Sequence, residues 1–379
     1  MKRASLLSLA LLAGCANPHA IQPPPPAQPS AWAAAPSPQS EAIFHSNPRW
    51  LGADAAYSIP LSPNRSLWLF GDTFIGLTPQ NVRTASTMVR NSIGILQGDT
   101  LSSGRMDFAW RTKSDGTPGS FFPEKDKHLY WPGHGIRLAN GPLVIFLYVM
   151  IDTPGQGLGF ACAGYALAVV ENPDDAPSDW HVQITEQPPQ PFDAVPATAV
   201  VQQGPWVVAL AVRQNGVHAG ALVRYPANAL ARGDLSDAQW WMGPQRGWVS
   251  QTDMGQAGPT WVMDDAGAEC SLHWDAPLQR FVHVASYGFG ATQVGVRTAP
   301  AITGPWTAPT MVYRPPEDNQ PKPFVYAAKG HPELHADKPG GLVVTYATNS
   351  LEFGELVSPD GQQRLYWPRV VEVVPVGGR

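Results

Sequence analysis

Acidic residues recur beside five short apolar runs of this sequence. Asp54, Glu269 and Glu333 precede a run, whereas Asp72 and Asp152 directly follow one. Like charges crowded into a partly buried space raise the pKa of one carboxyl group and leave another ionised. A protonated acid beside an ionised carboxylate can act on one bond near neutral pH. These residues therefore indicate catalysis by paired carboxylates.

The apolar runs define the elements that must position these acids. They begin at Leu67, Leu143, Trp206, Phe281 and Leu342, and strand-like stretches flank each one. This spacing is typical of β-propeller blades, so the sequence predicts an all-β, five-bladed β-propeller with four antiparallel strands per blade. The first strand of a blade is innermost and antiparallel to the second, so its start and the end of the second strand share one face. We therefore expect the five acids around one axial mouth, unless each of them merely caps a turn.

The outer stretches of each unit fit the same prediction. The third stretch reads Gly164-Tyr-Ala-Leu-Ala-Val-Val170 in the second unit and Gly354-Glu-Leu-Val357 in the last. The fourth is expected to carry a tryptophan that fills the gap between the outer strands of neighbouring blades. These tryptophans are Trp110, Trp180, Trp240 or Trp241, Trp306 and Trp367.

Composition agrees with a strand-rich fold and narrows the choice of partners. Charged residues make up only 15% of the 379 residues, and there are 40 prolines and 36 glycines, which suits short strands joined by turns. The formal net charge is −5 and the chain has no run of Lys and Arg, which argues against nucleic acid as a partner. No apolar stretch reaches transmembrane length.

The N-terminal segment has the pattern of a secretion signal. Lys2 and Arg3 precede the apolar run from Leu6 to Leu12, and the sequence Leu12-Ala-Gly-Cys15 resembles a bacterial lipobox. The sequence thus predicts a signal peptide over residues 1–14, a lipidated Cys15 with a Pro/Ala-rich tether over 15–44, and the propeller over 45–379. Acyl chains such as palmitate would anchor the protein in the bacterial cell envelope. Because Ala16 rather than Asp follows the cysteine, we expect the lipoprotein to be sorted to the outer membrane.

The other cysteines and histidines leave alternatives open. Cys162 and Cys270 could form a disulfide or remain two buried thiols. No cofactor is expected, because the usual metal, nucleophile and phosphate-binding motifs are absent from the sequence. A structural Ca²⁺ or other ion in the central tunnel could be held by His331 or Glu333 with water.

Several motifs carry a family resemblance. Trp50-Leu-Gly-Ala-Asp54, Leu67–Gly76 and Arg90-Asn-Ser-Ile93 resemble the opening of a group of five-bladed propellers long catalogued as domains of unknown function. Some members of this group are endo-acting D-arabinanases. Further matches are Tyr130-Trp-Pro-Gly-His-Gly135, Glu269–Trp274, Gly304-Pro-Trp306 and His331-Pro-Glu-Leu334.

More distantly, the chain is similar to the arabinanase, xylosidase and invertase propellers. Those relatives take an acid from each of the first three blades, but here the second and third blades carry Gly133 and Ala197 instead. The order of roles therefore does not transfer. What the resemblance does carry over is a pair of aspartates, Asp54 and Asp72.

The resemblance implies an envelope-anchored glycoside hydrolase that cleaves a furanose-containing or similar polysaccharide. Such cleavage needs one protonated acid and one ionised carboxylate. We expect Asp54 as base or nucleophile, Glu269 as general acid, and Asp72 orienting Asp54 or exchanging roles with Glu269. The alternative is a non-catalytic glycan-binding or scaffold propeller. Residues expected around the substrate are Trp131, His134, Asp152, Tyr287, Glu333, Arg90, Asn91 and His331.

Overall fold

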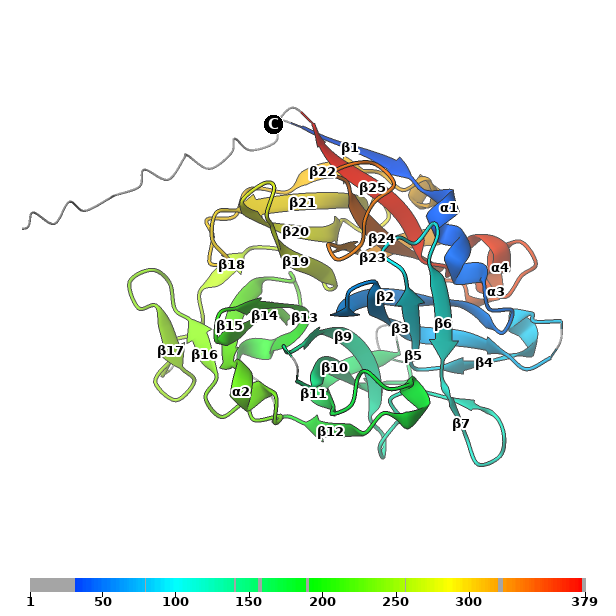
Figure 1. The fold of residues 1–379 in the computed structure, drawn as a ribbon, viewed down its shortest axis with the longest axis horizontal. Coiled ribbons are helices and arrows are strands. Elements are labelled where there is room, and N and C mark those ends of the chain that lie inside the picture. The colour runs from blue at the N-terminus through cyan, green and yellow to red at the C-terminus, as the bar shows by residue number, and fades with distance from the viewer. Residues whose placement is uncertain are drawn as a thin grey trace, which may run out of the picture.

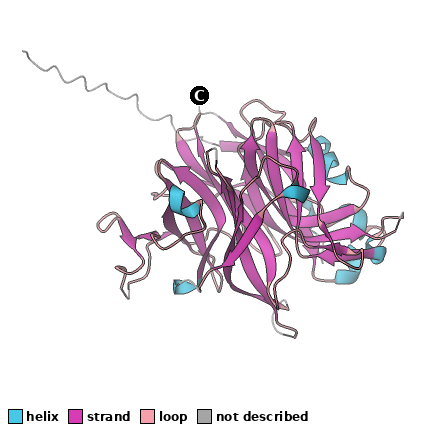
Figure 2. Cartoon of the chain, turned by 60° about the horizontal axis from the view of Figure 1, so that its bottom comes forward, coloured by secondary structure: helices cyan, strands magenta, loops and turns pink. Residues whose placement is uncertain are grey.

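Five antiparallel sheets surround a central axis, as Figure 1 shows, and strands dominate the tilted view in Figure 2. This computed structural model describes residues 31–78, 80–139, 141–155, 159–188, 191–255, 257–319 and 323–376. The prediction of an all-β, five-bladed propeller is confirmed.

The blades follow one another around the ring in chain order. Their innermost strands are β2, β9, β13, β19 and β23, and each of these contacts the innermost strand of the next blade. Blade 1 holds β2 (Trp50–Ser62), β3 (Arg65–Gly76), β5 (Ser92–Gln97) and β6 (Arg105–Ala109), with β4 (Ser86–Val89) paired to β3. Blade 2 holds β9 (Leu129–Arg137), β10 (Leu143–Asp152), β11 (Phe160–Val170) and β12 (Val182–Glu186).

Blade 3 has two additional short strands. It holds β13 (Ala194–Gln203), β14 (Trp206–Arg213), β15 (Gly220–Pro226), β16 (Gln239–Trp241) and β17 (Trp248–Ser250), with β18 (Trp261–Met263) paired to β15. Blade 4 holds β19 (Cys270–Asp275), β20 (Arg280–Tyr287), β21 (Gln293–Ala299) and β22 (Thr310–Tyr313). Blade 5 holds β23 (Pro323–His331), β24 (Leu342–Ser350), β25 (Arg369–Val376) and β1 (Ala31–Pro36).

The remaining elements are short. A two-stranded ribbon pairs β7 (Arg111–Thr112) with β8 (Pro118–Gly119). The described helices are α1 (Pro38–Glu41), α2 (Ala227–Leu230), α3 (Phe353–Leu356), α4 (Gly361–Arg364) and the single turns η1 (Ala42–His45), η2 (Arg83–Ala85), η3 (Pro177–Asp179), η4 (Pro191–Asp193) and η5 (Pro316–Asn319). None of the helices in the described ranges is long and apolar enough to cross a membrane.

The core lies between neighbouring blades, which explains why the second strands are continuously apolar. In β10, Val144 and Phe146 pack toward blade 3, whereas Ile145 and Leu147 pack toward blade 1. All four are buried, because successive side chains of a strand point to opposite faces and here both faces are covered.

The ring closes with a strand from the segment predicted as tether. β1 pairs with β25 from Ala31↔Val376 to Pro36↔Val371, and the two lie side by side in Figure 1. The predicted boundary at residue 45 is therefore too late. The alanine- and proline-rich composition hid this strand, because Trp32 is its only large side chain, and it packs against the core between blades 4 and 5. Residues 1–30, which include the predicted signal peptide and Cys15, lie outside the described residues.

Blade 5 also differs from prediction in its outer half. Gly354-Glu-Leu-Val357, expected as the third strand, forms α3 and the residue after it, and Trp367 precedes β25 instead of lying on a fourth strand. The third strand is β25 and the fourth is β1, because the chain wraps its two ends together in this blade.

Cys162 and Cys270 are both free. Cys270 is fully buried, and burial raises the pKa of both thiols, for Cys162 to about 11.

Candidate functional site

Asp54 lies where the innermost strand of blade 1 is most irregular. The pairing of β2 with β3 shifts register on both sides of Ala55, and Ala55 and Ala56 have left-handed backbones with φ of 62° and 61°. Alanine adopts such angles only when its surroundings hold it there, and bulges of this kind re-aim neighbouring side chains. The strained part of the backbone therefore directly follows Asp54 and helps to set the direction of its carboxylate.

Asp54 is held by tyrosines from blade 5. The hydroxyl of Tyr326 donates to Oδ2 of Asp54 at 2.6 Å, and the amide of Asn349 donates to the Tyr326 hydroxyl at 3.2 Å. Burial and, to a lesser extent, the charges of Asp72 and Glu269 raise the pKa of Asp54 to about 7, against the lowering effect of hydrogen bonds from Tyr326 and Tyr366. Asp54 is consequently poised to carry a proton near neutral pH.

Gly71 explains why the sequence reads Phe70-Gly-Asp72. A Cβ at this position would lie 2.3 Å from Oδ1 of Asp54, so any larger residue would displace the carboxylate. The glycine thus allows Asp54 on β2 and Asp72 on β3 to share one site.

Asp72 is held by the side chains of Trp131 and Arg90. Nε1 of Trp131 donates to Oδ1 at 3.1 Å, and Nη1 of Arg90 lies 3.4 Å from Oδ2. Arg90 also reaches Asp152, with 3.9 Å between Nη2 and Oδ1. Burial raises the pKa of Asp72 to about 6, and the Arg90 charge and the Trp131 hydrogen bond limit the rise.

Glu269 pairs with a buried lysine. Nζ of Lys329 is 3.0 Å from Oε2 of Glu269, and it also donates to the carbonyls of Ala55 and Ala327. The side chain of Lys329 is only 1% exposed, so its ammonium needs a counter-charge, which Glu269 supplies. Lys329 therefore links Glu269 on blade 4 to the strained backbone next to Asp54.

The structure brings together six of the residues expected at the mouth. The charges of Asp72 and Glu269 both raise the pKa of Asp54, and the second group surrounds Asp72. That second group is Arg90, Trp131 and Asp152.

Glu333 does not join them, which corrects the prediction. It follows the end of β23, whereas Asp54 lies near the start of β2, so the two occupy opposite faces of the disc. The chain between β23 and β24 is a loop from 332 to 341, and the position in β23 that faces Asp54 is Tyr326. The prediction placed Glu333 by its distance from the apolar run that begins at Leu342. It was wrong because the loop before this run is longer than the turn between β2 and β3.

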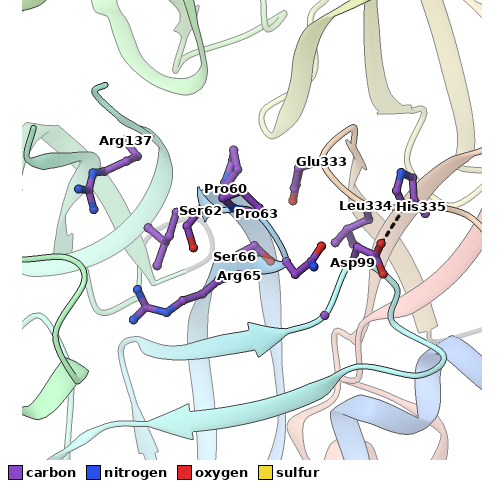
Figure 3. A pocket seen from close by; sticks show the side chains of 13 residues that line it. Pro60, Ser62, Pro63, Arg65, Ser66, Asp99, Arg137, Glu333, Leu334 and His335 are labelled. Carbon is purple, nitrogen blue, oxygen red and sulfur yellow. Dashed lines mark hydrogen bonds and ion pairs between the residues drawn. The ribbon is translucent and has the colours of Figure 1, made fainter. Parts of the chain in front are cut away.

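Glu333 instead lines a pocket of about 440 Å³ on that opposite face, shown in Figure 3. It lies between the β2–β3 turn and the end of β5 in blade 1, the end of β9 in blade 2 and the loop after β23 in blade 5, and burial raises the pKa of Glu333. Residues around it include Pro60, Ser62, Arg65, Asp99, Arg137 and His335.

Two histidines expected near the substrate join strands of different blades instead. His331 is fully buried, with Nδ1 2.6 Å from the hydroxyl of Ser58 and Nε2 2.8 Å from that of Thr345. His134 accepts from the backbone N–H of Val200 through Nδ1, so its Nε2 donates to the Ser58 carbonyl at 3.2 Å. Burial lowers the pKa of His134 to about 4, which keeps it neutral.

Asn91 and Tyr287 are also structural. The buried amide of Asn91 donates to the carbonyls of Phe122 and Tyr130, and its oxygen accepts from the N–H of Phe122. The hydroxyl of Tyr287 accepts from Nε of Arg297 at 3.0 Å inside the core between blades 3 and 4. Neither side chain is available to a ligand at the mouth.

Tyr326, Lys329 and Tyr366 also belong to this site, although the sequence did not indicate them. The signal for Lys329 was a lone lysine in the strand Pro323–His331, whose other residues are mostly apolar. No group of three or more His, Cys, Asp or Glu residues that could hold a metal occurs among the described residues. Both ring nitrogens of His331, one of the groups proposed for a tunnel ion, lie within hydrogen-bond distance of protein hydroxyls, those of Ser58 and Thr345.

Solved structures of known proteins share the fold. A proposed hydrolase from Bacteroides ovatus is 15% identical, with 90% of each chain covered and a TM-score of 0.69. The GH62 α-L-arabinofuranosidase of Coprinopsis cinerea is 9% identical, with 90% of this chain and 96% of that chain covered and a TM-score of 0.47. Xylan β-1,4-xylosidase of Bacillus halodurans is 10% identical, with 86% and 53% covered and a TM-score of 0.42.

At such low identity these likenesses concern the fold alone, and only the first has a TM-score above 0.5. No protein of curated function matches the sequence. A family model described as a domain of unknown function, DUF5005, matches residues 39–375, which is nearly the whole propeller. The chain therefore belongs to the DUF5005 family.

Proposed function

We propose that the protein is a glycoside hydrolase that uses the mouth carboxylates on a furanose-containing or similar polysaccharide. The observation that carries this proposal is the shared position of two carboxyl groups on neighbouring strands, where Gly71 leaves room for Asp54 beside Asp72. Burial raises the pKa of Asp54 to about 7 and that of Asp72 to about 6. Such a pair supplies one protonated and one ionised carboxyl group at the same pH, which glycosidic cleavage requires.

The roles follow from the partners of each acid. Asp54 donates its proton to the leaving oxygen as the bond from that oxygen to the anomeric carbon breaks. The Asp72 carboxylate, paired with Arg90, removes a proton from the attacking water or attacks the anomeric carbon itself. Glu269 pairs with Lys329 and raises the pKa of Asp54. This assignment differs from the one that the sequence favoured, in which Asp54 was the base or nucleophile and Glu269 the general acid.

The test is incubation of the propeller with arabinans, galactans and bacterial envelope glycans, followed by assay of new reducing ends. Release by the wild-type protein supports the proposal. The substitution of Gly133 and Ala197 for acids in blades 2 and 3 favours the alternative, a glycan-binding propeller. A glycan that is retained by the protein but never shortened would establish that alternative.

The pH dependence of activity is the first quantitative prediction. Below about pH 6 Asp72 gains a proton, and above about pH 7 Asp54 loses its proton, so kcat/KM should peak between these values and fall on both sides. Arg90→Gln removes a charge that lowers the pKa of Asp72. This variant should move the acidic limb to higher pH and leave the alkaline limb in place. A flat profile from pH 5 to 8 would contradict the assignment.

We further propose that acyl chains on Cys15 anchor the enzyme in the bacterial envelope, in the outer membrane. The support is Leu12-Ala-Gly-Cys15 and the short stretch of chain between it and β1. Cys15→Ser should move the protein from the membrane fraction to the soluble fraction on ultracentrifugation. Ala16→Ser, which leaves the cysteine in place, is the control and should stay with the membranes. Equal fractionation of Cys15→Ser and wild type would refute the anchor.

A further inference from the structure

Exposed apolar side chains gather on the face that carries the carboxylates. In every blade the chain that follows the second strand bears at least one of them, and this is the face where Asp72 and Asp152 lie. These apolar side chains are Leu77, Phe160, Val217, Phe289, Leu351 and Phe353.

An aromatic row leads from solvent to Asp54. Phe289, in the loop between β20 and β21, is 70% exposed, and its ring centre lies 5.4 Å from that of Phe324 at the start of β23. The ring of Phe324 is in turn 5.4 Å from that of Tyr326, whose hydroxyl donates to Asp54. The row therefore ends at the proposed proton donor.

A second aromatic pair reaches the other aspartate from blade 2. The ring centre of Phe160 lies 4.7 Å from that of Trp131, and Trp131 donates to Asp72. Phe160 is 37% exposed. In a ring of five blades, blade 2 stands across the axis from the junction of blades 4 and 5, from which Phe289 and Phe324 come (Figure 1). The two sets of rings thus flank the carboxylates on opposite sides.

We propose that Phe289 and Phe324 form one sugar-binding subsite, that Phe160 and Trp131 form a second, and that a glycan chain crosses the mouth between them. This inference rests on the proposed function for the nature of the ligand. Sugar rings present C–H groups on their faces, and aromatic rings are the side chains that pack against such amphipathic surfaces. A chain that spans both subsites lies with an internal linkage over Asp54 and Asp72, so long glycans should bind better than short ones.

The test measures binding separately from catalysis. Affinity electrophoresis through gels that contain soluble arabinan, galactan or envelope glycan gives a dissociation constant for each variant. Phe289→Ala and Phe160→Ala should each weaken binding of the same polysaccharide by about tenfold, since each loses the burial of an aromatic ring. The matched control is Trp274→Ala, because Trp274 is 45% exposed but lies next to the last residue of β19, toward the opposite face. This variant should bind like wild type.

The outcomes separate the two proposals. Unchanged binding by Phe289→Ala overturns the subsite, whether or not hydrolysis persists. Weakened binding without any release of reducing ends supports the subsite and overturns the hydrolase. If Trp274→Ala weakens polysaccharide binding as much as Phe289→Ala does, the subsite is overturned, because the loss of any exposed aromatic ring would then have the same effect. If the wild-type protein is retained by none of these polysaccharides, both proposals fall.

Discussion

Asp54→Asn should lower glycan turnover by about a thousandfold while the protein remains folded. Asparagine keeps the shape of the side chain and can still accept the hydrogen bond from Tyr326, but it cannot donate a proton to a leaving oxygen. The loss should therefore appear in kcat. A substrate with a good leaving group needs less protonation and should be less impaired.

The same substitution should stabilise the fold above neutral pH. The pKa of Asp54 is raised to about 7 in the folded protein from an ordinary value of 3.8. Its presence therefore costs no stability at pH 3, where the folded and unfolded states are both protonated, and costs most above pH 7, where the buried group must ionise. At pH 8 Asp54→Asn should be more stable than wild type by about 2 kcal/mol, measured by urea unfolding.

Glu269→Gln is the matched control for the role of Asp54. If Asp54 donates the proton, Glu269→Gln should lose less activity, and its alkaline limb should move to lower pH because one charge that raises the pKa of Asp54 is gone. The reverse pattern, with good leaving groups rescuing Glu269→Gln alone, would make Glu269 the acid. Full activity in Asp54→Asn would end the catalytic assignment.

Much of the fold could be predicted because burial on both faces leaves a clear pattern. The second strands lie between two cores, so Leu143–Met150 and its counterparts appear as uninterrupted apolar runs. The closing strand Ala31–Pro36 has no such pattern, since it lies at the edge of blade 5 and pairs only with β25. The pairing of an edge strand depends on backbone hydrogen bonds, and every residue except proline has a backbone N–H to donate. Such pairing therefore requires no particular side chains.

The candidate site could be predicted only where the spacing from strand to strand is regular. Asp54 and Asp72 were found because β2 and β3 are joined by a tight turn, so counting from Leu67 reaches the right face. Because the loop before β24 is longer, the same count wrongly assigned Glu333 to the mouth. It also passed over Tyr326, which contacts Asp54, and Lys329, which contacts Glu269. The length of a surface loop leaves no pattern of apolar residues in the sequence. The periodicity of the strands therefore could not show how many residues separate β23 from β24.

Lys329→Met should destabilise the propeller by about 2 to 4 kcal/mol, because it leaves the partly buried Glu269 without its partner. The double variant Glu269→Gln with Lys329→Met removes both charges, so it should lose less stability than the sum of the two single variants. Urea unfolding of all four proteins gives the coupling energy directly. The exposed pair Arg105 and Asp107, 2.9 Å apart, is the control and should show a coupling near zero.

The activity of the same four proteins separates a positioning role from a merely structural one. Lys329 bonds the carbonyl of Ala55, the residue after Asp54, as well as Glu269. Its loss should therefore lower kcat by about ten- to a hundredfold under conditions where the protein is fully folded, with little change in KM, because a donor displaced by a fraction of an ångström misses the leaving oxygen. The double variant should regain stability without regaining kcat, since the Ala55 carbonyl remains unbound. Recovery of both together would mean that Lys329 serves the fold alone.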